Sequence, residues 1–410
     1  MLKYDVTIIG AGLNGLVAAL ALGGRRSSRP LNVVVIDRAD PQRFANSSYD
    51  SRASALTSAT QTMFATLGLW HNVKAQVQDM LKIVVTDAGS AAIDRSSLLS
   101  FAMKDGDKPA AAMVENHHLF ASVLAEIKKS SRITLLAGRS LQNISFGPGL
   151  ACVTLDDGTE IKSSLVIGAD GRSSLTREAA GLKLRGWAYK QSAITLTVAH
   201  ELPHEGTAEE HFTPTGVFAI LPLHGDRSSL VWTENHDEAQ RICKLEEADF
   251  LKEVSKRFGT HRGTLSLASP RHVYPLSLMI TEEMVSNRLA LIGDAAHVIH
   301  PLAGLGLNLG FKDVAALAEC VMDALTLGQD IGGDVVLQRY ASWRRFDTVA
   351  TAYMLDGLNR LFANDISGLK FIRDVGLKLI NASAPAKNIL IKEAAGQTGN
   401  LPRLMRGLAV

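Results

Sequence analysis

The chain has 410 residues, a length that favours two domains or one large domain with an insertion. Hydrophobic residues make up 46% of it and charged residues 20%, a composition that excludes a disordered chain and is typical of a globular protein. The formal net charge of +2 lacks the broad positive field that nucleic-acid binding needs, so we expect no nucleic-acid partner.

The cysteines and the distribution of charge bear on the compartment. Cys152, Cys243 and Cys320 are widely spaced, which is typical of a reducing compartment, and no uninterrupted apolar stretch approaches a membrane span. From Arg339 onward, eleven Lys or Arg stand against five Asp or Glu. We therefore expect a cytoplasmic protein. Two explanations of this basic C-terminal region stay open: peripheral contact with the inner face of a membrane, and ordinary scatter of charge over the surface.

The chain begins with a pattern for dinucleotide binding. A β-branched run at 5–9 predicts a buried strand, residues 13–22 a helix, and 31–36 a second strand that ends at Asp37. Glycines at the first turn allow the backbone to touch a pyrophosphate, and an acid at the end of the second strand binds the ribose. The residues in question are Gly10, Gly12, Gly15 and Asp37.

Helices and strands alternate in the next part of the chain. We expect helices at 54–69 and 119–129 and a strand at 132–136. Residues 151–155 and 160–167 form a hairpin-like pair around Asp156-Asp157-Gly158. This pair leads to a second glycine segment, Gly168-Ala-Asp170-Gly171-Arg172.

From about residue 187 to residue 278 the periodic helices become rare and strand-like runs dominate. The expected strands are 192–200, 216–223 and 228–233, with one clear helix at 246–258. A buried strand at 288–292 then leads to a third glycine segment, Gly293-Asp294-Ala-Ala-His297, followed by helices at 307–325 and 335–361 and a looser helical tail containing Pro385 and Pro402. An acid at the end of a strand can bind the hydroxyl groups of a polyol. Glycines at the start of the following helix let its amides approach an electron-rich ring edge. In a flavin these groups are the ribityl chain and the edge of the isoalloxazine ring.

These patterns predict an α/β fold in which a Rossmann-like FAD-binding domain carries an inserted antiparallel-sheet substrate domain and a C-terminal helical region. The expected limits are 1–185 and 286–345 for the FAD-binding domain, 186–285 for the substrate domain, and 346–410 for the helical region.

Together, the three glycine segments resemble those of the class A flavoprotein monooxygenases, the group of p-hydroxybenzoate hydroxylase. Within that group the chain is most similar to the ubiquinone biosynthesis hydroxylases, and the resemblance covers essentially its whole length. The segments that carry this second likeness include Asp50-Ser-Arg52-Ala-Ser-Ala-Leu56, Val114-Glu-Asn116, Phe212-Thr-Pro-Thr-Gly216 and Gly399-Asn-Leu-Pro-Arg403. The family usually carries Gln where this chain has Leu305.

The resemblance implies FAD as cofactor and assigns residues to it. Arg52 and Asn116 are expected along the flavin and its pyrophosphate, and Gly293 and Asp294 at the ribityl or pyrophosphate region. The ring edge is expected at Gly304, Gly306, Leu307 and Asn308. Asp170, Gly171 and Arg172 match the family's D-G motif, which is linked to both the flavin and the nicotinamide cofactor.

The resemblance also implies the reaction. A family member takes hydride from NADH or NADPH, forms a flavin C4a-hydroperoxide with O2, and hydroxylates an aromatic ring, here a polyprenylated phenol of ubiquinone biosynthesis. The expected partners are therefore this lipid-tailed substrate and other ubiquinone-biosynthesis proteins. The wall of the substrate site is expected at Phe218, Leu221, Pro222 and Pro301. Hydroxylation of a soluble aromatic, and a flavin-binding accessory protein without turnover, remain alternatives.

Two histidine pairs have a spacing that could bind a metal ion. His297 and His300 lie three residues apart, and His117 and His118 are adjacent. Neither pair has a third ligand in a matching sequence context, so we expect no metal site.

Overall fold

The computed structural model describes residues 2–46, 52–87, 97–102, 109–362 and 392–410. Its first sheet has the order β18-β19-β11-β1-β2-β8, in which β19, β11, β1, β2 and β8 run parallel. β1 (Leu2–Ile9), α1 (Leu13–Gly23) and β2 (Val33–Asp37) form the predicted β-α-β unit, and Asp37 ends β2 as expected. Hydrophobic side chains cover both faces of these strands, which a parallel sheet between layers requires.

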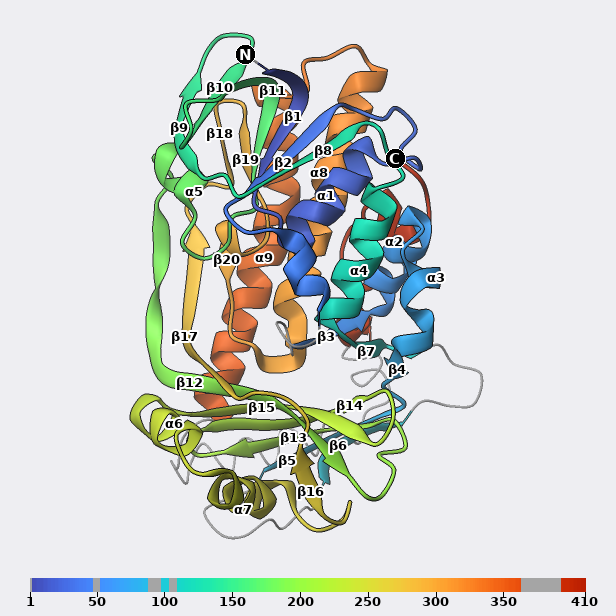
Figure 1. The fold of residues 1–410 in the computed structure, drawn as a ribbon, viewed down its shortest axis with the longest axis vertical. Coiled ribbons are helices and arrows are strands. Elements are labelled where there is room, and N and C mark those ends of the chain that lie inside the picture. Colours follow the sequence, from blue (N-terminus) through green and yellow to red (C-terminus); the bar gives the residue numbers. More distant parts are fainter. Residues whose placement is uncertain (1, 47–51, 88–96, 103–108, 363–391) are drawn as a thin grey trace.

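A second, mostly antiparallel sheet lies at the other end of the molecule (Figure 1). Its order is β20-β17-β12-β15-β14-β13-β5-β6, and β16 pairs with β12. The long strands β12 (Leu184–His200) and β17 (His272–Thr281) run together from the first sheet to the second. The predicted α/β fold with an antiparallel second sheet is therefore confirmed. β5 and β6 enter this sheet from residues 82–102, ahead of the expected substrate domain, so the chain passes between the two sheets more than once.

One expected helix is shorter in the structure, and one helix was not expected. The helix expected at 54–69 begins only at Ser58, because Ala53–Thr57 forms β3, which pairs with β7 in a small third sheet. The Thr57 hydroxyl then accepts a hydrogen bond from the Thr60 amide and caps α2. A second helix, α6 (His236–Cys243), accompanies the expected one, α7 (Glu247–Phe258), and its eight residues are too short to show a periodic pattern.

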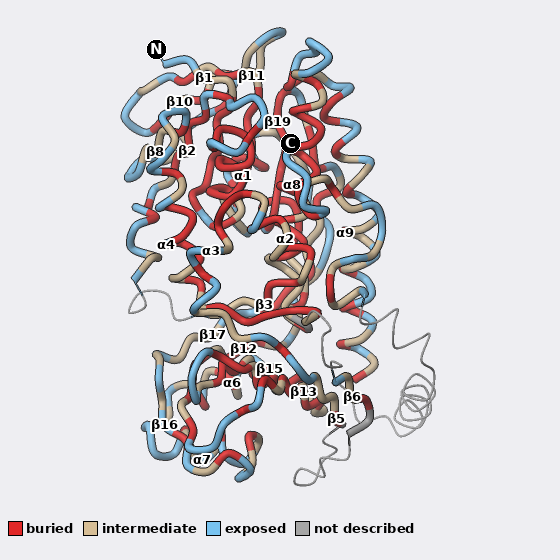
Figure 2. The backbone as a smooth tube through the Cα atoms, turned by 90° about the vertical axis from the view of Figure 1, so that its right-hand side faces the viewer, coloured by how far each residue is buried: buried red, intermediate tan, exposed pale blue. Residues whose placement is uncertain are grey.

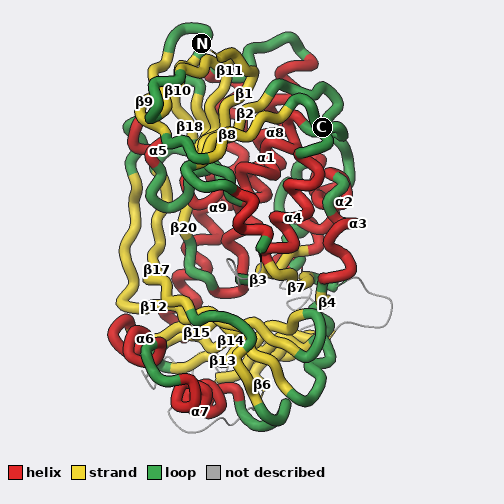
Figure 3. Tube along the Cα trace, viewed as in Figure 1, coloured by secondary structure: helices red, strands yellow, loops and turns green. Residues whose placement is uncertain are grey.

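Two long helices complete the frame. α8 (Leu305–Thr326) packs beside α1, and α9 (Asp334–Phe362) runs from the first sheet to the second (Figure 1; Figure 3 shows the same view by element type). The larger core lies between the first sheet and its helices, and a separate core lies between the second sheet and α6 and α7 (Figure 2). The part of the expected helical tail around Pro385 lies outside the described residues, whereas Pro402 immediately precedes a short 3-10 helix, Arg403–Arg406. In the part of the chain that the structure describes, no helix is long and apolar enough to cross a bilayer.

The remaining elements connect these layers. The helices are α3 (Trp70–Val73), α4 (Asn116–Ile127) and α5 (Leu175–Ala179). The strands are β4 (Gln78–Asp79), β5 (Lys82–Asp87), β6 (Ser97–Ala102), β7 (Ala111–Glu115), β8 (Ile133–Ala137), β9 (Leu141–Phe146), β10 (Ala151–Leu155), β11 (Glu160–Gly168), β13 (Thr207–Thr213), β14 (Gly216–Leu223), β15 (Arg227–Asn235), β16 (Leu265–Leu267), β18 (Val285–Ser286), β19 (Leu289–Leu291) and β20 (His297–Val298).

A buried ionic network joins α8, α9 and the loop after β19. The Asp313 carboxylate accepts hydrogen bonds from Arg344 Nε at 2.8 Å, His297 Nε2 at 2.6 Å and the Gly293 amide at 3.1 Å. Burial alone would raise the pKa of Asp313, but the adjacent His297 and Arg344 hold that pKa below its usual value. The carboxylate therefore stays charged inside the core and ties the third glycine segment to both helices.

Replacing Arg344 with alanine leaves the Asp313 charge buried without its permanently charged partner. We expect Arg344→Ala to lower the free energy of unfolding by about 3–5 kcal/mol in urea denaturation. Arg345→Ala is the matched control, because Arg345 is exposed on the same helix and its loss should change stability by less than about 0.5 kcal/mol. Equal unfolding midpoints for the two variants would show that the network contributes little.

Candidate functional site

A cavity of about 1210 Å³ lies between the two sheets. It is lined by the ends of β1 and β2, the first turns of α1 and α8, one face of the second sheet, and the last turns of α9. A single small ligand usually occupies roughly 300–1,000 Å³, so this cavity has room for a large cofactor together with a second molecule.

The first and second glycine segments meet at one end of the cavity. Gly10 has a φ of +109°, and a Cβ there would lie 2.3 Å from the Ala169 carbonyl oxygen. A Cβ at Gly15 would lie 2.0 Å from the Gly10 carbonyl oxygen, so α1 packs directly on the turn. A Cβ at Gly12 would meet no protein atom within 4 Å, although Gly12 lines the cavity. Protein packing therefore explains Gly10 and Gly15, whereas Gly12 leaves space for a ligand at the start of a helix.

The third glycine segment meets the first through Asn14, a residue that the sequence reasoning did not single out. A Cβ at Gly293 would lie 2.3 Å from Asn14 Nδ2, and one at Gly310 would lie 2.2 Å from the same atom. The Asn14 side chain therefore fills the narrow space between the loop after β19 and α8. The only feature of the sequence that could have indicated this role is the presence of an asparagine inside the first glycine motif.

Two acids predicted for the site are held by backbone amides. The Asp37 carboxylate lines the cavity and accepts hydrogen bonds from the amides of Ala11 at 2.7 Å and Ala39 at 2.8 Å. Asp170 also lines the cavity and accepts from the Thr176 amide and hydroxyl, both at 2.9 Å, so it fixes the start of α5. Arg172 does not line the cavity. Its guanidinium instead donates to the Pro275 carbonyl and the Ser277 hydroxyl on β17.

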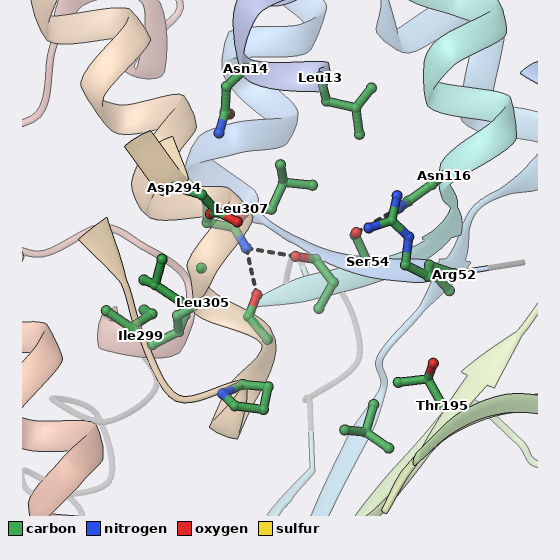
Figure 4. A pocket seen from close by; sticks show the side chains of 18 of the residues that line it. Leu13, Asn14, Arg52, Ser54, Asn116, Thr195, Asp294, Ile299, Leu305 and Leu307 are labelled. Carbon is green, nitrogen blue, oxygen red and sulfur yellow. Dashed lines mark hydrogen bonds between the residues drawn. The ribbon is translucent and has the colours of Figure 1, made fainter. Parts of the chain in front are cut away.

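Arg52, Ser54 and Asn116 gather on one side of the cavity, where β3 meets the end of β7 (Figure 4). The Ser54 hydroxyl donates to Asn116 Oδ1 at 2.7 Å. The backbone amide of Asn116 donates to the backbone carbonyl of Arg52 at 2.8 Å. The structure thus places the Arg52 cation and the Asn116 side chain together on the wall of the cavity.

Asp294 and the start of α8 form the opposite side of the cavity (Figure 4). The Asp294 side chain is exposed to the cavity but enclosed by the surrounding protein, and this burial raises its pKa, while His297 and Arg52 act in the opposite direction. Gly306, Leu307 and Asn308 contribute the first turn of α8, whose amides have no partners within the helix. The Asn308 side chain faces the protein. It accepts from the Thr57 amide and donates to the Ala55 carbonyl.

The face of the second sheet toward the cavity differs in part from the expected wall. Leu221 and Pro301 line the cavity, but Phe218 and Pro222 do not. Side chains alternate along β14, so Val217, Ala219 and Leu221 face the cavity, whereas Phe218 packs with Trp232 in the core beneath the sheet. The wall that we expected at Phe218 and Pro222 is therefore reassigned to their neighbours Val217 and Ala219.

Most of the predicted residues surround this one cavity. Those that line it are Gly10, Gly12, Asp37, Arg52, Asn116, Asp170, Gly171, Leu221, Asp294, Pro301, Gly304, Gly306, Leu307 and Asn308. Those that do not are Gly15, Arg172, Phe218, Pro222 and Gly293. The sequence reasoning missed Asn14, Ser54 and the second-sheet residues Val217, Ala219 and Val231.

The histidine pairs have different surroundings. His297 is bound to Asp313, and His300 packs edge-on against Tyr189 with ring centroids 5.3 Å apart. Glu115, His117 and His118 place their possible metal-binding atoms within 4.8 Å of one another. Glu115 is thus a third possible ligand beside the His117–His118 pair, which the sequence pattern did not reveal. Arg227 donates to both Glu115 oxygens, at 3.1 and 2.8 Å, so this carboxylate already has a cationic partner.

His300 lines the cavity and is 1% exposed. Its Nδ1 accepts a hydrogen bond from the Leu302 amide at 3.3 Å, and burial lowers its pKa to about 4, although Asp356 opposes the shift. The folded protein thus keeps this imidazole neutral at a pH where an unfolded chain would protonate it.

The lowered pKa of His300 predicts a loss of stability in mild acid. Between its usual pKa of about 6.5 and the folded value, the unfolded chain binds the extra proton, so the free energy of unfolding falls as the pH falls. His300→Gln should remove about 2 kcal/mol of the decrease between pH 7 and pH 5, measured by urea denaturation. His71→Gln, at an exposed histidine, should keep the full decrease. An unchanged pH dependence in His300→Gln would refute the assignment.

Comparisons with known proteins agree with this geometry. The model of the FAD binding domain family matches residues 3–348. The ubiquinone hydroxylase UbiL of Rhodospirillum rubrum is 40% identical over 407 residues, which are 98% of this chain and 93% of that protein. The 3-demethoxyubiquinol 3-hydroxylase of Escherichia coli is 31% identical, over 96% of this chain and 98% of that protein.

A solved structure shows the same fold. The p-nitrophenol 4-monooxygenase PnpA of Pseudomonas putida superposes with a TM-score of 0.79 at 17% identity, over 98% of this chain and 100% of that one. The three glycine segments, the shared fold and these relatives lead to one conclusion. The chain belongs to the FAD-binding family of flavin-dependent monooxygenases, and FAD is its cofactor.

Proposed function

We propose that the protein hydroxylates the aromatic ring of a polyprenylated phenol in ubiquinone biosynthesis, using NADH or NADPH and O2. The main support is a single cavity that joins a dinucleotide-binding backbone at one end to a broad apolar compartment at the other. The names of the relatives support the pathway, since the Rhodospirillum rubrum and Escherichia coli proteins are a ubiquinone hydroxylase and a demethoxyubiquinol hydroxylase.

The residues around the glycine segments fit FAD. Gly12 and the first turn of α1 would hold the pyrophosphate, Asp37 the adenosine ribose, and Arg52 and Asn116 the middle of the cofactor. Asp294 would hold the ribityl region, and the first turn of α8 the ring edge. When bound, FAD supplies the redox chemistry, which we propose follows the C4a-hydroperoxide route of the class A monooxygenases.

The chain itself would position the ring and exclude water. Val217, Ala219 and Val231 form an apolar floor on the second sheet, and Thr195 and Thr233 add hydroxyl groups to it. These hydroxyls can orient the phenol oxygen, while the apolar floor keeps water from the reacting end of the site. Arg172 would act indirectly, by tying the Asp170 loop to β17.

The far end of the cavity fits a hydrocarbon tail better than a polar substrate. Apolar side chains from β5, β6, β13 and α9 surround it: Ile83, Val85, Leu99, Phe101, Phe212, Leu355, Leu358 and Phe362. A hydrocarbon chain gains about 0.8 kcal/mol for each CH2 group buried there. Hydroxylation of a soluble aromatic would leave this compartment without a function.

Gly12 provides a direct test of the cofactor site. We expect Gly12→Ala to fold as apoprotein with a melting temperature lowered by only about 2–4 °C, because its Cβ meets no protein atom and the substitution costs only part of the N-cap preference of α1, and to bind FAD at least about tenfold more weakly. Flavin fluorescence titration and thermal unfolding measure the two effects. Gly149→Ala, at a loop glycine that is also free of contacts, is the control and should alter neither. If Gly12→Ala bound FAD as tightly as wild type, the pyrophosphate would not bind at Gly12.

The substrate is tested by deletion of the gene and mass analysis of lipid extracts. We expect a polyprenylated precursor lacking one hydroxyl group to accumulate, and the wild-type gene to restore the quinone, whereas the Gly12→Ala gene should not. The purified protein should oxidise NADH or NADPH faster with that precursor than with soluble phenols. A normal quinone profile would reject the pathway. Bound FAD without oxidation of either nicotinamide, with any substrate, would favour an accessory role, for which Leu305 is the sequence indication.

A further inference from the structure

The second half of α9 exposes a stripe of apolar residues bounded by arginines. We call this the α9 stripe; it consists of Arg345, Phe346, Val349, Ala350, Tyr353, Met354, Gly357 and Arg360. Phe346 is 79% exposed, Tyr353 55% and Met354 39%. The opposite face of the helix is buried against the protein, and α9 lies at the edge of the molecule in Figure 2. Large side chains gathered on one exposed face indicate a surface that contacts something else.

The charges of the α9 stripe suit an anionic surface. Both acids within the same turns are paired: Asp347 is bound by Lys312 and Arg344, and buried Asp356 is bound by Tyr189 and by Arg360 of the stripe itself. Arg345 is therefore an exposed cation at one end of the stripe, whereas Arg360 at the other end is exposed but shares its charge with Asp356, and no exposed acid lies between them. Basic groups beside the surface of an anionic bilayer contribute roughly 1 kcal/mol each.

The aromatic residues of this region also fit a lipid interface. The Tyr353 ring lies 6.4 Å from that of Trp187 on β12, and the Arg360 guanidinium lies 4.9 Å from the Trp187 ring centre. Tryptophan and tyrosine are enriched where membrane proteins meet lipid headgroups. A preformed helix also binds without the cost of folding on the surface.

The α9 stripe is continuous with the apolar end of the cavity. Met354 is partly exposed and also lines the cavity, and Leu355, Leu358 and Phe362 from the following turns line the cavity as well. One helix thus presents an apolar outer surface and an apolar cavity wall within two turns. A hydrocarbon tail that leaves the cavity beside Met354 would meet the stripe and not open water.

We propose that the α9 stripe docks the protein on an anionic lipid bilayer, so that a lipid-tailed substrate passes from the membrane into the cavity beside Met354. This inference rests on the proposed function for the identity of the substrate. The docking itself is a separate property of the surface. It can be measured with lipid vesicles in the absence of any substrate.

The test compares two double variants of the full chain. Phe346→Ser with Tyr353→Ser removes the aromatic side chains of the stripe and spares Met354, which lines the cavity. Leu327→Ser with Val335→Ser is the matched control, because these residues are 70% and 77% exposed outside the stripe. In sedimentation with phosphatidylcholine–phosphatidylglycerol vesicles, the stripe variant should bind at least about tenfold more weakly than wild type, and the control like wild type. Pure phosphatidylcholine vesicles should bind wild type more weakly than the mixture.

Two results would overturn the docking proposal. One is equal vesicle binding by wild type and the stripe variant. The other is a wild-type dimer that the stripe variant converts to a monomer in light scattering, which would assign the stripe to a second copy of this chain. Failure of the proposed function has a different signature, in which the stripe still governs vesicle binding but no polyprenylated phenol is hydroxylated. A short-tailed phenol in solution should be turned over equally by wild type and the stripe variant.

Discussion

Close backbone packing at the ends of three parallel strands is the constraint on which the site depends. Gly10 lies against the Ala169 carbonyl, and Asn14 lies between Gly293 and Gly310, at distances that leave no room for a Cβ. Segments far apart in the chain therefore approach one another closely, through backbone at Gly10 and through the Asn14 side chain at Gly293 and Gly310. A larger side chain at any of these contacts would separate the strands that a dinucleotide must bridge.

The ionic network around Asp313 extends this constraint to the helices. One carboxylate binds the Gly293 amide, His297 and Arg344, so the loop carrying Asp294 is tied to both α8 and α9. A buried charge that satisfies three donors is costly to separate from any of them. The loop carrying Asp294 and the helix that forms the far wall of the cavity are therefore linked through one buried side chain, although about fifty residues separate Asp294 from Arg344.

Local patterns in the sequence predicted the β-α-β unit, the place of Asp37 and the long C-terminal helices, because these depend on neighbours in the chain. The direction of single side chains was harder to predict. Both faces of β14 are apolar, one toward the cavity and one toward Trp232, so alternation could not decide between Phe218 and Val217. Asn14 and Asn308 act through residues on other elements, and their contacts depend on tertiary packing that no local motif encodes.

α9 has three structural roles: it is anchored in the core, it lines the cavity, and it forms part of the surface. Arg344 anchors it in the core, Leu355 and Leu358 close the cavity, and Phe346 and Tyr353 face outward. A helix has room for all three because buried, cavity-lining and exposed positions recur at different angles around its axis. Because Arg344 is held in the core, the positions of Phe346 and Tyr353 along the helix axis are fixed relative to the cavity. A surface held in that way keeps a fixed position relative to the cavity, as the proposed docking beside Met354 requires.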